Sequence, residues 1–452
     1  MAVDSDAGAL EPRLQEVDLR CASLLESSNA VRWEVFAKAS VTRQTEVRQG
    51  RLKRSVQIEE SGIGVRSWDG NRTGFAAASA LDASAARTAV ETARAGARAG
   101  ADPMPPARLL GTVPVAPGPD MPPRGWAQHI AGELGLALAG LSGSVLRLER
   151  VVVQEGRYHW TLSTGDGWSA DHGRMVASLL LEVLVGDRPG IWREWVHISD
   201  PGSFDAEAVA SRLGNRILLT RNRVATDSGL HDLILHPEVT AQLLAAVSPL
   251  FLAADDARDP LPRLLDSSGF LASFPLTLVD DRSDPGAPVV SPCDGEGFPA
   301  NRTLLLEEGA PRHRVASWAD AHRFDEIPRG GAVRLSYRDR PATGLTNLRV
   351  ATRDGVPPGE LLAASRRALY VLRPLAPVVC DFERDTYSLI ASGVWLRRQQ
   401  VRGWHPVVEL SGSLGTLLRR IAVVGEDLCW FQTAHGFVGA PSLLIRRQPV
   451  VG

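Results

Sequence analysis

Four carboxylates gather in one glycine-rich stretch of this sequence: Asp280, Asp281, Asp294 and Glu296. Carboxylate oxygens can ligate a hard cation, and they can also accept backbone N–H groups in tight turns. The spacing lacks the regular pattern of a calcium-binding loop, so it favours turns over a metal site. Apolar runs at 274–279 and 303–307 flank the group and predict two strands joined by an ordered acidic loop.

Two histidines, His231 and His236, imitate a zinc motif because an acid, Asp232, follows the first of them. Such a motif works when both imidazoles project from one helix face and the acid activates a metal-bound water. Here the spacer ends in Leu-Ile-Leu and Pro237 follows the second histidine, which predicts a strand that ends at a helix start. Residues five apart on a strand lie ~16 Å apart, at ~3.3 Å per residue, and face opposite sides. Two such nitrogens cannot share one zinc.

The other residues capable of chemistry show no spacing that defines a site. The remaining histidines lack ligand spacing, and the sequence has no catalytic-serine elbow, phosphate-binding loop or dinucleotide fingerprint. The cysteines are far apart and form no Cys-x-x-Cys pair, which argues against a disulfide scaffold, a zinc ribbon and a redox motif. They are Cys21, Cys293, Cys380 and Cys429.

The chain has 452 residues, enough for about two or three domains with their own cores. Its formal net charge of −2 gives no electrostatic case for binding nucleic acid or an anionic membrane. The first residues lack the basic and apolar segments of a signal peptide. No run reaches the ~18 apolar residues of a membrane-spanning helix. We expect a protein of the reducing cytoplasm.

Residues 1–226 mix helix and strand signals and predict an N-terminal α/β domain with a mixed sheet. Asp82 is a good N-cap for an alanine-rich helix, and Ser203 is expected to cap a helix over 205–220. Prolines and glycines over 101–123 predict a long loop. Further helices are predicted at 9–29 and 122–139, and strands at 32–37, 55–58, 63–68, 145–154, 158–163, 175–185 and 191–198.

We place the main boundary near Asp227, so that residues 227–452 form a second domain. It opens with a short strand at 233–235 and a helix that begins at His236 and Pro237. Many short β-rich runs follow at regular spacing, which predicts a mostly antiparallel, strongly curved or barrel-like sheet domain. The fold class is therefore α+β.

Several short segments have the order and spacing of one known family. In the first half they are Glu60-Ser-Gly-Ile-Gly-Val-Arg66 and Arg72-Thr-Gly-Phe75. In the second half they are the strand-to-helix segment 233–244, the acidic segments 276–281 and 294–297, Thr346-Asn-Leu348, and the C-terminal pieces 424–425 and 439–444. Together they resemble the TldD/TldE (PmbA) metallopeptidase family over nearly the whole chain.

The resemblance implies a heterodimer. TldD-type chains of this family carry His-Glu-x-x-x-His on the helix after the strand, together with a C-terminal cysteine, and hold zinc; TldE-type chains lack these ligands. Matching the helices places the three motif positions at about Ala245, Ala246 and Leu250, which are all apolar. Without the histidines, Cys429 is interpreted as a buried thiol. The chain is identified as a TldE-type subunit that binds no metal or cofactor, with zinc expected in a TldD-like partner.

The resemblance also implies a reaction, the hydrolysis of peptides or of N-acyl groups in microbial biosynthesis. The partner's zinc would polarise the amide carbonyl and activate water, while this chain stabilises the partner and walls part of the substrate cleft. No catalytic residue is expected in this chain. Its candidates for the cleft or the interface are Asp294, Glu296, Gly297 and Asn347, for which turn and strand-end hydrogen bonding is the alternative role.

Two functions of other classes stay open. One is a stand-alone hydrolase with a non-zinc acidic site, Asp280 and Asp281 beside a histidine, which predicts activity of the pure chain. The other is a non-catalytic binding or scaffold protein, which predicts that no zinc protein co-purifies. A neighbouring gene for a His-Glu-x-x-x-His chain of similar length would favour the subunit over both.

Overall fold

The computed structural model describes residues 10–27, 32–70, 72–99, 103, 105–106, 112–113, 122–142, 145–186, 191–225, 227–253, 259–351 and 354–450. The predicted features of the chain start, residues 1–8, and most of the predicted loop 101–123 lie outside these residues. In the described part, no helix combines the length and the apolar character needed to cross a membrane.

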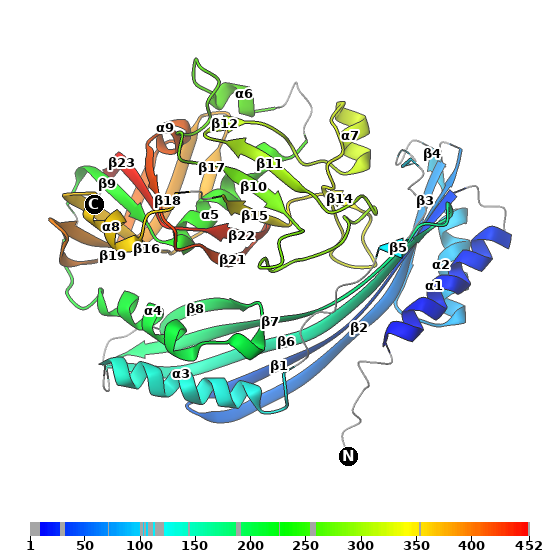
Figure 1. Cartoon of the computed structure of the whole chain (residues 1–452), viewed down its shortest axis with the longest axis horizontal. Coiled ribbons are helices and arrows are strands. Elements are labelled where there is room, and N and C mark those ends of the chain that lie inside the picture. Colours follow the sequence, from blue (N-terminus) through cyan, green and yellow to red (C-terminus); the bar gives the residue numbers. More distant parts are fainter. Residues whose placement is uncertain are drawn as a thin grey trace.

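A long, curved sheet of eight strands dominates the first half (Figure 1). Its strands are β1 Arg32–Arg48, β2 Arg51–Asp69, β3 Arg72–Ala78, β4 Arg98–Ala99, β5 Thr112–Val113, β6 Leu146–Thr164, β7 Ser169–Val185 and β8 Ile191–Ile198. The order is β4-β3-β2-β1-β6-β7, with β8 antiparallel and β5 parallel to β7. The parallel pair makes the sheet mixed, as predicted.

Two of these strands are longer than the sequence pattern suggests. The predicted strands 145–154 and 158–163 are parts of one strand, β6, and 55–58 and 63–68 are parts of β2. Turn-like residues separate the pieces in the sequence. They do not break the strands because β1 pairs with both neighbours without interruption there: Ala39 lies opposite Ser61, and Thr42 lies opposite Gly156.

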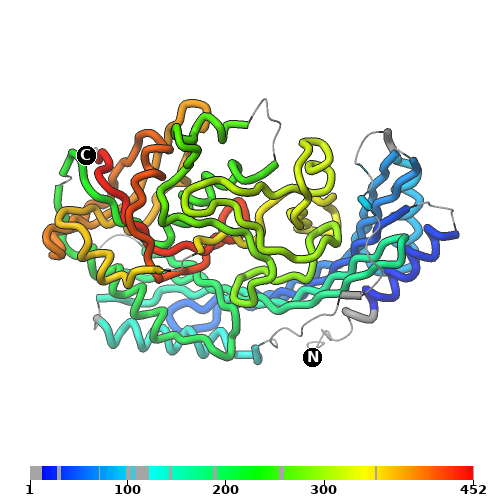
Figure 2. Tube along the Cα trace, turned by 45° about the horizontal axis from the view of Figure 1, so that its top comes forward, coloured from blue at the N-terminus to red at the C-terminus, as the bar shows by residue number. Residues whose placement is uncertain are grey.

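Four helices pack on this sheet: α1 Leu10–Ser27, α2 Ala83–Ala95, α3 Trp126–Ser142 and α4 Ala206–Leu218. Helices α1 and α2 cover the end of the sheet that extends past the C-terminal half, and α3 and α4 lie at the other end (Figure 2). Asp82 caps α2 as predicted, because its carboxylate accepts the Ala85 N–H at 2.8 Å. The predicted cap of α4 is wrong. Residues Pro201–Ser203 form a 3-10 turn, so α4 starts later and Asp205 accepts the Ala208 N–H.

The contact of α1 with the sheet includes a carboxyl group with a raised pKa. Asp18 accepts the Ser163 hydroxyl at 2.6 Å. Burial, with a smaller contribution from the nearby Asp171, raises the pKa of Asp18 to about 6. The folded state therefore holds this proton more tightly than the unfolded chain, and the stability contribution of Asp18 falls as the pH rises from about 4 to about 6.

We expect Asp18→Asn to stabilise the protein near pH 7 by about 1–2 kcal/mol, after allowance for solvent screening at this half-buried position. An amide oxygen still accepts the serine hydroxyl but carries no charge. Urea midpoints at about pH 4 and about pH 7 test this, because the two proteins should differ only at the higher pH. Glu16→Gln, on an exposed turn of the same helix, is the matched control. A variant that gains equally at both pH values would contradict the titration of Asp18.

The second half contains three sheets. Their strands are β9 Gly229–Leu235, β10 Leu278–Asp281, β11 Arg302–Glu307, β12 Ala310–Pro311, β13 Ala332–Val333, β14 Ala342–Thr343, β15 Asn347–Val350, β16 Arg367–Pro374, β17 Val379–Asp381, β18 Thr386–Arg397, β19 Gln400–Ser413, β20 Ile421–Val424, β21 Cys429–Thr433, β22 Gly436–Ala440 and β23 Leu443–Val450. The order is β17-β18-β16-β9-β23-β20 in one sheet, with β19 on β18, and β12-β11-β10-β15-β22-β21 in another; β13 pairs with β14. Most pairs are antiparallel, with β15–β22 and β16–β9 parallel, and the sheets are strongly curved, as predicted. They curve around a central helix (Figure 1).

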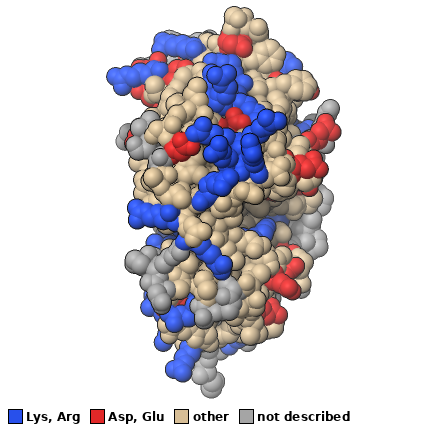
Figure 3. Space-filling model, turned by 90° about the vertical axis from the view of Figure 1, so that its left-hand side faces the viewer, with Lys and Arg blue, Asp and Glu red and all other residues tan. Residues whose placement is uncertain are grey.

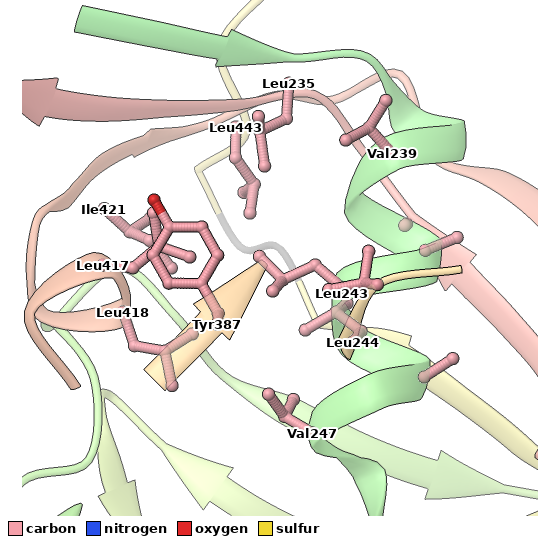
Figure 4. Packing of buried hydrophobic residues seen from close by; sticks show 14 of the residues in the cluster. Leu235, Val239, Leu243, Leu244, Val247, Tyr387, Leu417, Leu418, Ile421 and Leu443 are labelled. Carbon is pink, nitrogen blue, oxygen red and sulfur yellow. The ribbon is translucent and has the colours of Figure 1, made fainter. Parts of the chain in front are cut away.

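That central helix is α5 Pro237–Val247; the shorter helices are α6 Leu261–Leu264, α7 Trp318–Phe324, α8 Pro358–Ala363 and α9 Leu414–Arg419. Leucines from α5, β9, β23 and α9 meet around it (Figure 4). The alternation of β9 divides its side chains between two cores. Leu233 and Leu235 face α5, whereas Ile234 packs into a core shared with α3, α4 and the N-terminal sheet. The two halves are thus joined by apolar packing through the seven-stranded sheet.

Figure 3 shows a cluster of basic side chains on one face of the C-terminal half. Arg367 on β16 lies opposite Arg397 on β18, and the Arg398 N–H donates to the carbonyl of Arg366. All four side chains are exposed. The formal net charge of −2 therefore conceals a locally basic surface.

Candidate functional site

A cavity of 580 Å³ lies between the eight-stranded sheet and the C-terminal half. Its sheet wall consists of Phe36, Lys38, Tyr158, Trp160 and Leu162. Its opposite wall includes Arg282, Ser291, Cys293, Asp294, Arg334, Leu335, Thr346 and His435. The volume and the mainly apolar and aromatic lining are those of pockets that bind small molecules or segments of chain.

Strand register explains why the sheet wall is aromatic. Side chains alternate between the two faces of a strand, so Tyr158, Trp160 and Leu162 of β6 all face the cavity. In the antiparallel ladder, Phe36 lies opposite Leu162 and Lys38 lies opposite Trp160. The Phe36 and Trp160 rings lie 6.0 Å apart between centroids. The cavity wall is therefore a continuous apolar surface with one lysine in it.

The acidic loop forms part of the opposite wall through Asp294. Its carboxylate accepts the N–H groups of Glu296 at 2.8 Å, Phe298 at 2.9 Å and Ala332 at 3.1 Å. Burial raises the pKa of Asp294, and attraction to Arg282 opposes this rise. Gly297 closes the turn with a φ of 82°, a conformation that glycine adopts without strain. These contacts support the turn interpretation of the acidic loop.

Asn347 and Asp280 anchor the base of this loop. Asp280 accepts the N–H groups of Thr346 at 2.9 Å and Asn347 at 2.7 Å. The Asn347 amide group donates to the carbonyls of Asp281 and Val289 and accepts the Val289 N–H. Asn347 is fully buried and is not among the cavity-lining residues. Its contacts hold β10, β15 and the 287–289 segment together.

A buried ion cluster connects the two halves beside the cavity. Arg66 on β2 lies 3.0 Å from the Glu34 carboxylate of β1 and 3.4 Å from the Glu296 carboxylate of the acidic loop. Arg334 forms a second ion pair with Glu34. All four side chains are at most 2% exposed. Burial raises the pKa of Glu296, and Arg66 opposes this rise. The cluster joins the N-terminal motif of the sequence to its acidic loop.

The same motif contains two glycines for steric reasons. A Cβ atom at Gly62 would lie 2.3 Å from the ring of Tyr337, and one at Gly64 would lie 2.3 Å from the Tyr337 carbonyl oxygen. The segment that carries Tyr337 also supplies Leu335, whose carbonyl accepts a hydrogen bond from Lys38. The two glycines therefore allow the segment around Tyr337, which belongs to the second half of the chain, to pack directly against β2.

Of the four predicted site residues, Asp294, Glu296 and Gly297 share one turn, and Asp294 lines the cavity. Glu296 belongs to the ion cluster, Gly297 to the turn and Asn347 to the base of the loop. The aromatic wall and Lys38 were not predicted. The alternation of Tyr158, Trp160 and Leu162 was a signal for it, but pairing with Lys38 follows only from the register of β1 and β6.

The histidines and the zinc-motif positions lie as the sequence predicts. His231 is on β9 with its ring against Trp395, and His236 is the N-cap of α5, where it contacts Arg216. Ala245 and Leu250 are 4% and 2% exposed in the core around α5, so these positions offer no donor atom and do not fit a zinc ion. Among the described residues, no group of three or more His, Cys, Asp and Glu side chains is arranged to hold a metal. Cys429, predicted to be a buried thiol, is only half-buried, and burial raises the pKa of its thiol.

Comparison with known proteins places both halves in one family. Residues 33–97 match the family model of PmbA/TldA metallopeptidase domain 1, and residues 228–452 match that of the PmbA/TldA metallopeptidase C-terminal domain. A curated metalloprotease of Synechocystis sp. is 29% identical over 188 residues, which is 39% of this chain and 40% of that protein's length.

Solved structures show the same fold. TldE from Thermococcus kodakarensis superposes with a TM-score of 0.77 at 16% identity, over 98% of this chain and 100% of that chain. A candidate modulator of a DNA gyrase from Thermotoga maritima superposes with a TM-score of 0.74 at 16% identity, over 97% of this chain and 100% of that chain. The motif around Arg66 lies inside the first family match and the acidic loop inside the second. The chain belongs to the TldD/TldE (PmbA) metallopeptidase family.

Proposed function

We propose that this chain is the TldE-type subunit of a heterodimeric, zinc-dependent peptidase or amide hydrolase. It stabilises a TldD-like, zinc-binding partner and forms part of the cleft for a peptide or an N-acylated small molecule, including substrates of natural-product biosynthesis. Hydrolysis takes place in the partner, and no residue of this chain is assigned a catalytic role.

The observation that carries the proposal is the environment of α5. The positions matched to the zinc motif, Ala245, Ala246 and Leu250, are apolar, and α5 is surrounded by the leucine-rich core of Figure 4. A structural zinc site contributes on the order of 10 kcal/mol and requires its ligands. Losing both histidines and the acid removes the metal and its general base together. We infer that a family member without its own metal acts as the companion subunit of a chain that binds the metal.

The test is zinc content and amide-hydrolase activity of the purified chain, alone and co-expressed with the TldD-like protein encoded nearest to it. We expect no zinc and no turnover in the lone chain, and one zinc per heterodimer with turnover in the pair. A partner whose two motif histidines are replaced by alanine is the control, because it should still bind this chain but lose both zinc and activity. Stoichiometric zinc or turnover in the lone chain would contradict the proposal.

The same experiment separates the other two functions. A stand-alone hydrolase would show turnover without a partner, with Asp280 and Asp281 as its acidic site. However, both carboxylates already accept hydrogen bonds, Asp280 from two backbone N–H groups and Asp281 from Ser283. A scaffold protein would bind no TldD-like chain at all.

A further inference from the structure

Lys38 stands out among the charged residues of the cavity. The sequence contains two lysines, Lys38 and Lys53, among 50 basic residues, so nearly every other cation is an arginine. Lys53 is on an exposed part of β2, whereas Lys38 is half-buried in the aromatic wall. A lysine ammonium has three N–H donors on a flexible stem and can reorient toward a ligand.

The other two buried cations of the cavity are already engaged. Arg334 pairs with Glu34, and Arg282 donates to Thr346 at 2.7 Å and to the carbonyl of Ala332 at 3.2 Å. Burial of a cation is favourable only when its charge and its donors are compensated. Arg334 is therefore paired with a carboxylate, whereas Arg282 uses its donors on the Thr346 hydroxyl and on the carbonyls of Cys293 and Ala332. The donors of both arginines thus have structural roles.

The ammonium of Lys38 has one hydrogen-bond acceptor among the described residues. It donates to the Leu335 carbonyl at 2.7 Å and lies 5.9 Å from the centroid of the Tyr158 ring. In the described part of the chain, no carboxylate lies within 4.0 Å of it. Burial lowers the pKa of Lys38, and the more distant Glu60 and Asp339 only partly oppose this. An anion in the cavity would supply the missing counter-charge.

We propose that the cavity binds an organic carboxylate with an apolar or aromatic body, whose carboxylate pairs with Lys38. The body lies against Phe36, Tyr158 and Trp160. A single carboxylate matches one available ammonium, whereas a phosphate dianion would require more donors than the site offers. This inference deepens the proposed function and rests on it: the part of the cleft that this chain supplies recognises the free carboxyl end of a peptide or of an N-acyl amino acid.

The binding test uses the full chain without a partner and two probes that differ only in charge. N-acetylphenylalanine has the carboxylate, and N-acetylphenylalaninamide has the same body without it. We expect the acid to bind with a Kd on the order of 1 mM and about tenfold more tightly than the amide, measured by calorimetry. Lys38→Met should remove the preference for the acid, and Lys53→Met should keep it. Equal binding of the two probes by the natural chain would overturn the proposal, as would a preference that survives in Lys38→Met.

A second measurement needs no variant. An amine-acylating reagent modifies both lysines, and mass spectrometry identifies each site without ambiguity because there are only two. Saturating acid probe should slow acylation of Lys38 by about fivefold and leave Lys53 unchanged, and the amide at the same concentration should protect Lys38 less. Equal acylation of Lys38 with and without the acid would also overturn the proposal, even if Lys38→Met failed to fold.

The two proposals fail in different ways. A lone chain that prefers the acid probe, but forms no active zinc heterodimer, would keep the carboxylate site and lose the subunit role. An active heterodimer whose TldE-type chain shows neither preference nor protection would keep the subunit role and lose the carboxylate site.

Discussion

Arg66→Met is expected to lower the free energy of unfolding by about 3–5 kcal/mol. The arginine lies between two buried carboxylates, Glu34 and Glu296, and both are 1% exposed. Methionine fills a similar volume but leaves Arg334 as the remaining cation of the described cluster. A buried carboxylate without a counter-charge costs more free energy than the original ion pairs contribute. Removing one partner of a buried pair is therefore more destabilising than replacing the whole pair by apolar residues. Urea unfolding at about pH 7 measures the loss.

The pH dependence of this deficit identifies its cause. Protonation removes the uncompensated charge, so the difference between Arg66→Met and the natural chain should shrink as the pH falls from about 7 to about 5. Arg51→Met, at the exposed start of the same strand, should change stability by less than about 0.5 kcal/mol. If the Arg66 variant loses the same amount at every pH, lost packing rather than charge explains the effect.

Asn347→Ala is expected to cost about 3 kcal/mol or more. The change leaves two carbonyls, of Asp281 and Val289, and the Val289 N–H without their side-chain partner in a fully buried place. Each unsatisfied buried group costs about 1–3 kcal/mol, and the small cavity left by the side chain adds to this. Val289 lines the 580 Å³ cavity, so the acid probe should also bind more weakly.

Asn301→Ala, at the exposed end of the same loop, is the matched control and should leave both stability and probe binding unchanged. The two readouts separate two roles of Asn347. A loss of stability with unchanged binding would restrict it to holding the strands. Unchanged stability would show that water replaces the amide group and that the contacts of Asn347 do not stabilise the base of the loop.

Local sequence patterns were sufficient to predict the features that depend only on residues close together in the sequence. The proline after His236 ends a strand and starts a helix, because proline lacks an N–H and suits the first helical turn. The pairing of β10 with β11 around the acidic loop followed from apolar runs and turn residues in one stretch. The apolar character of the zinc-motif positions could also be predicted, since it depends only on residue type.

Local sequence patterns could not predict which distant segments of the chain pair with one another. Arg66 and Glu296 are 230 positions apart, and no periodicity relates them. The cavity wall depends on the register of β1 and β6, since a shift of one residue would place Lys38 and Trp160 on different faces of the sheet. The sequence by itself determined the resemblance to the family, the α+β class and the apolar residues at the three positions matched to the zinc motif. Only the tertiary structure decided which cation of the cavity has donors left for a ligand, because burial and hydrogen-bond partners depend on segments that come together in the fold.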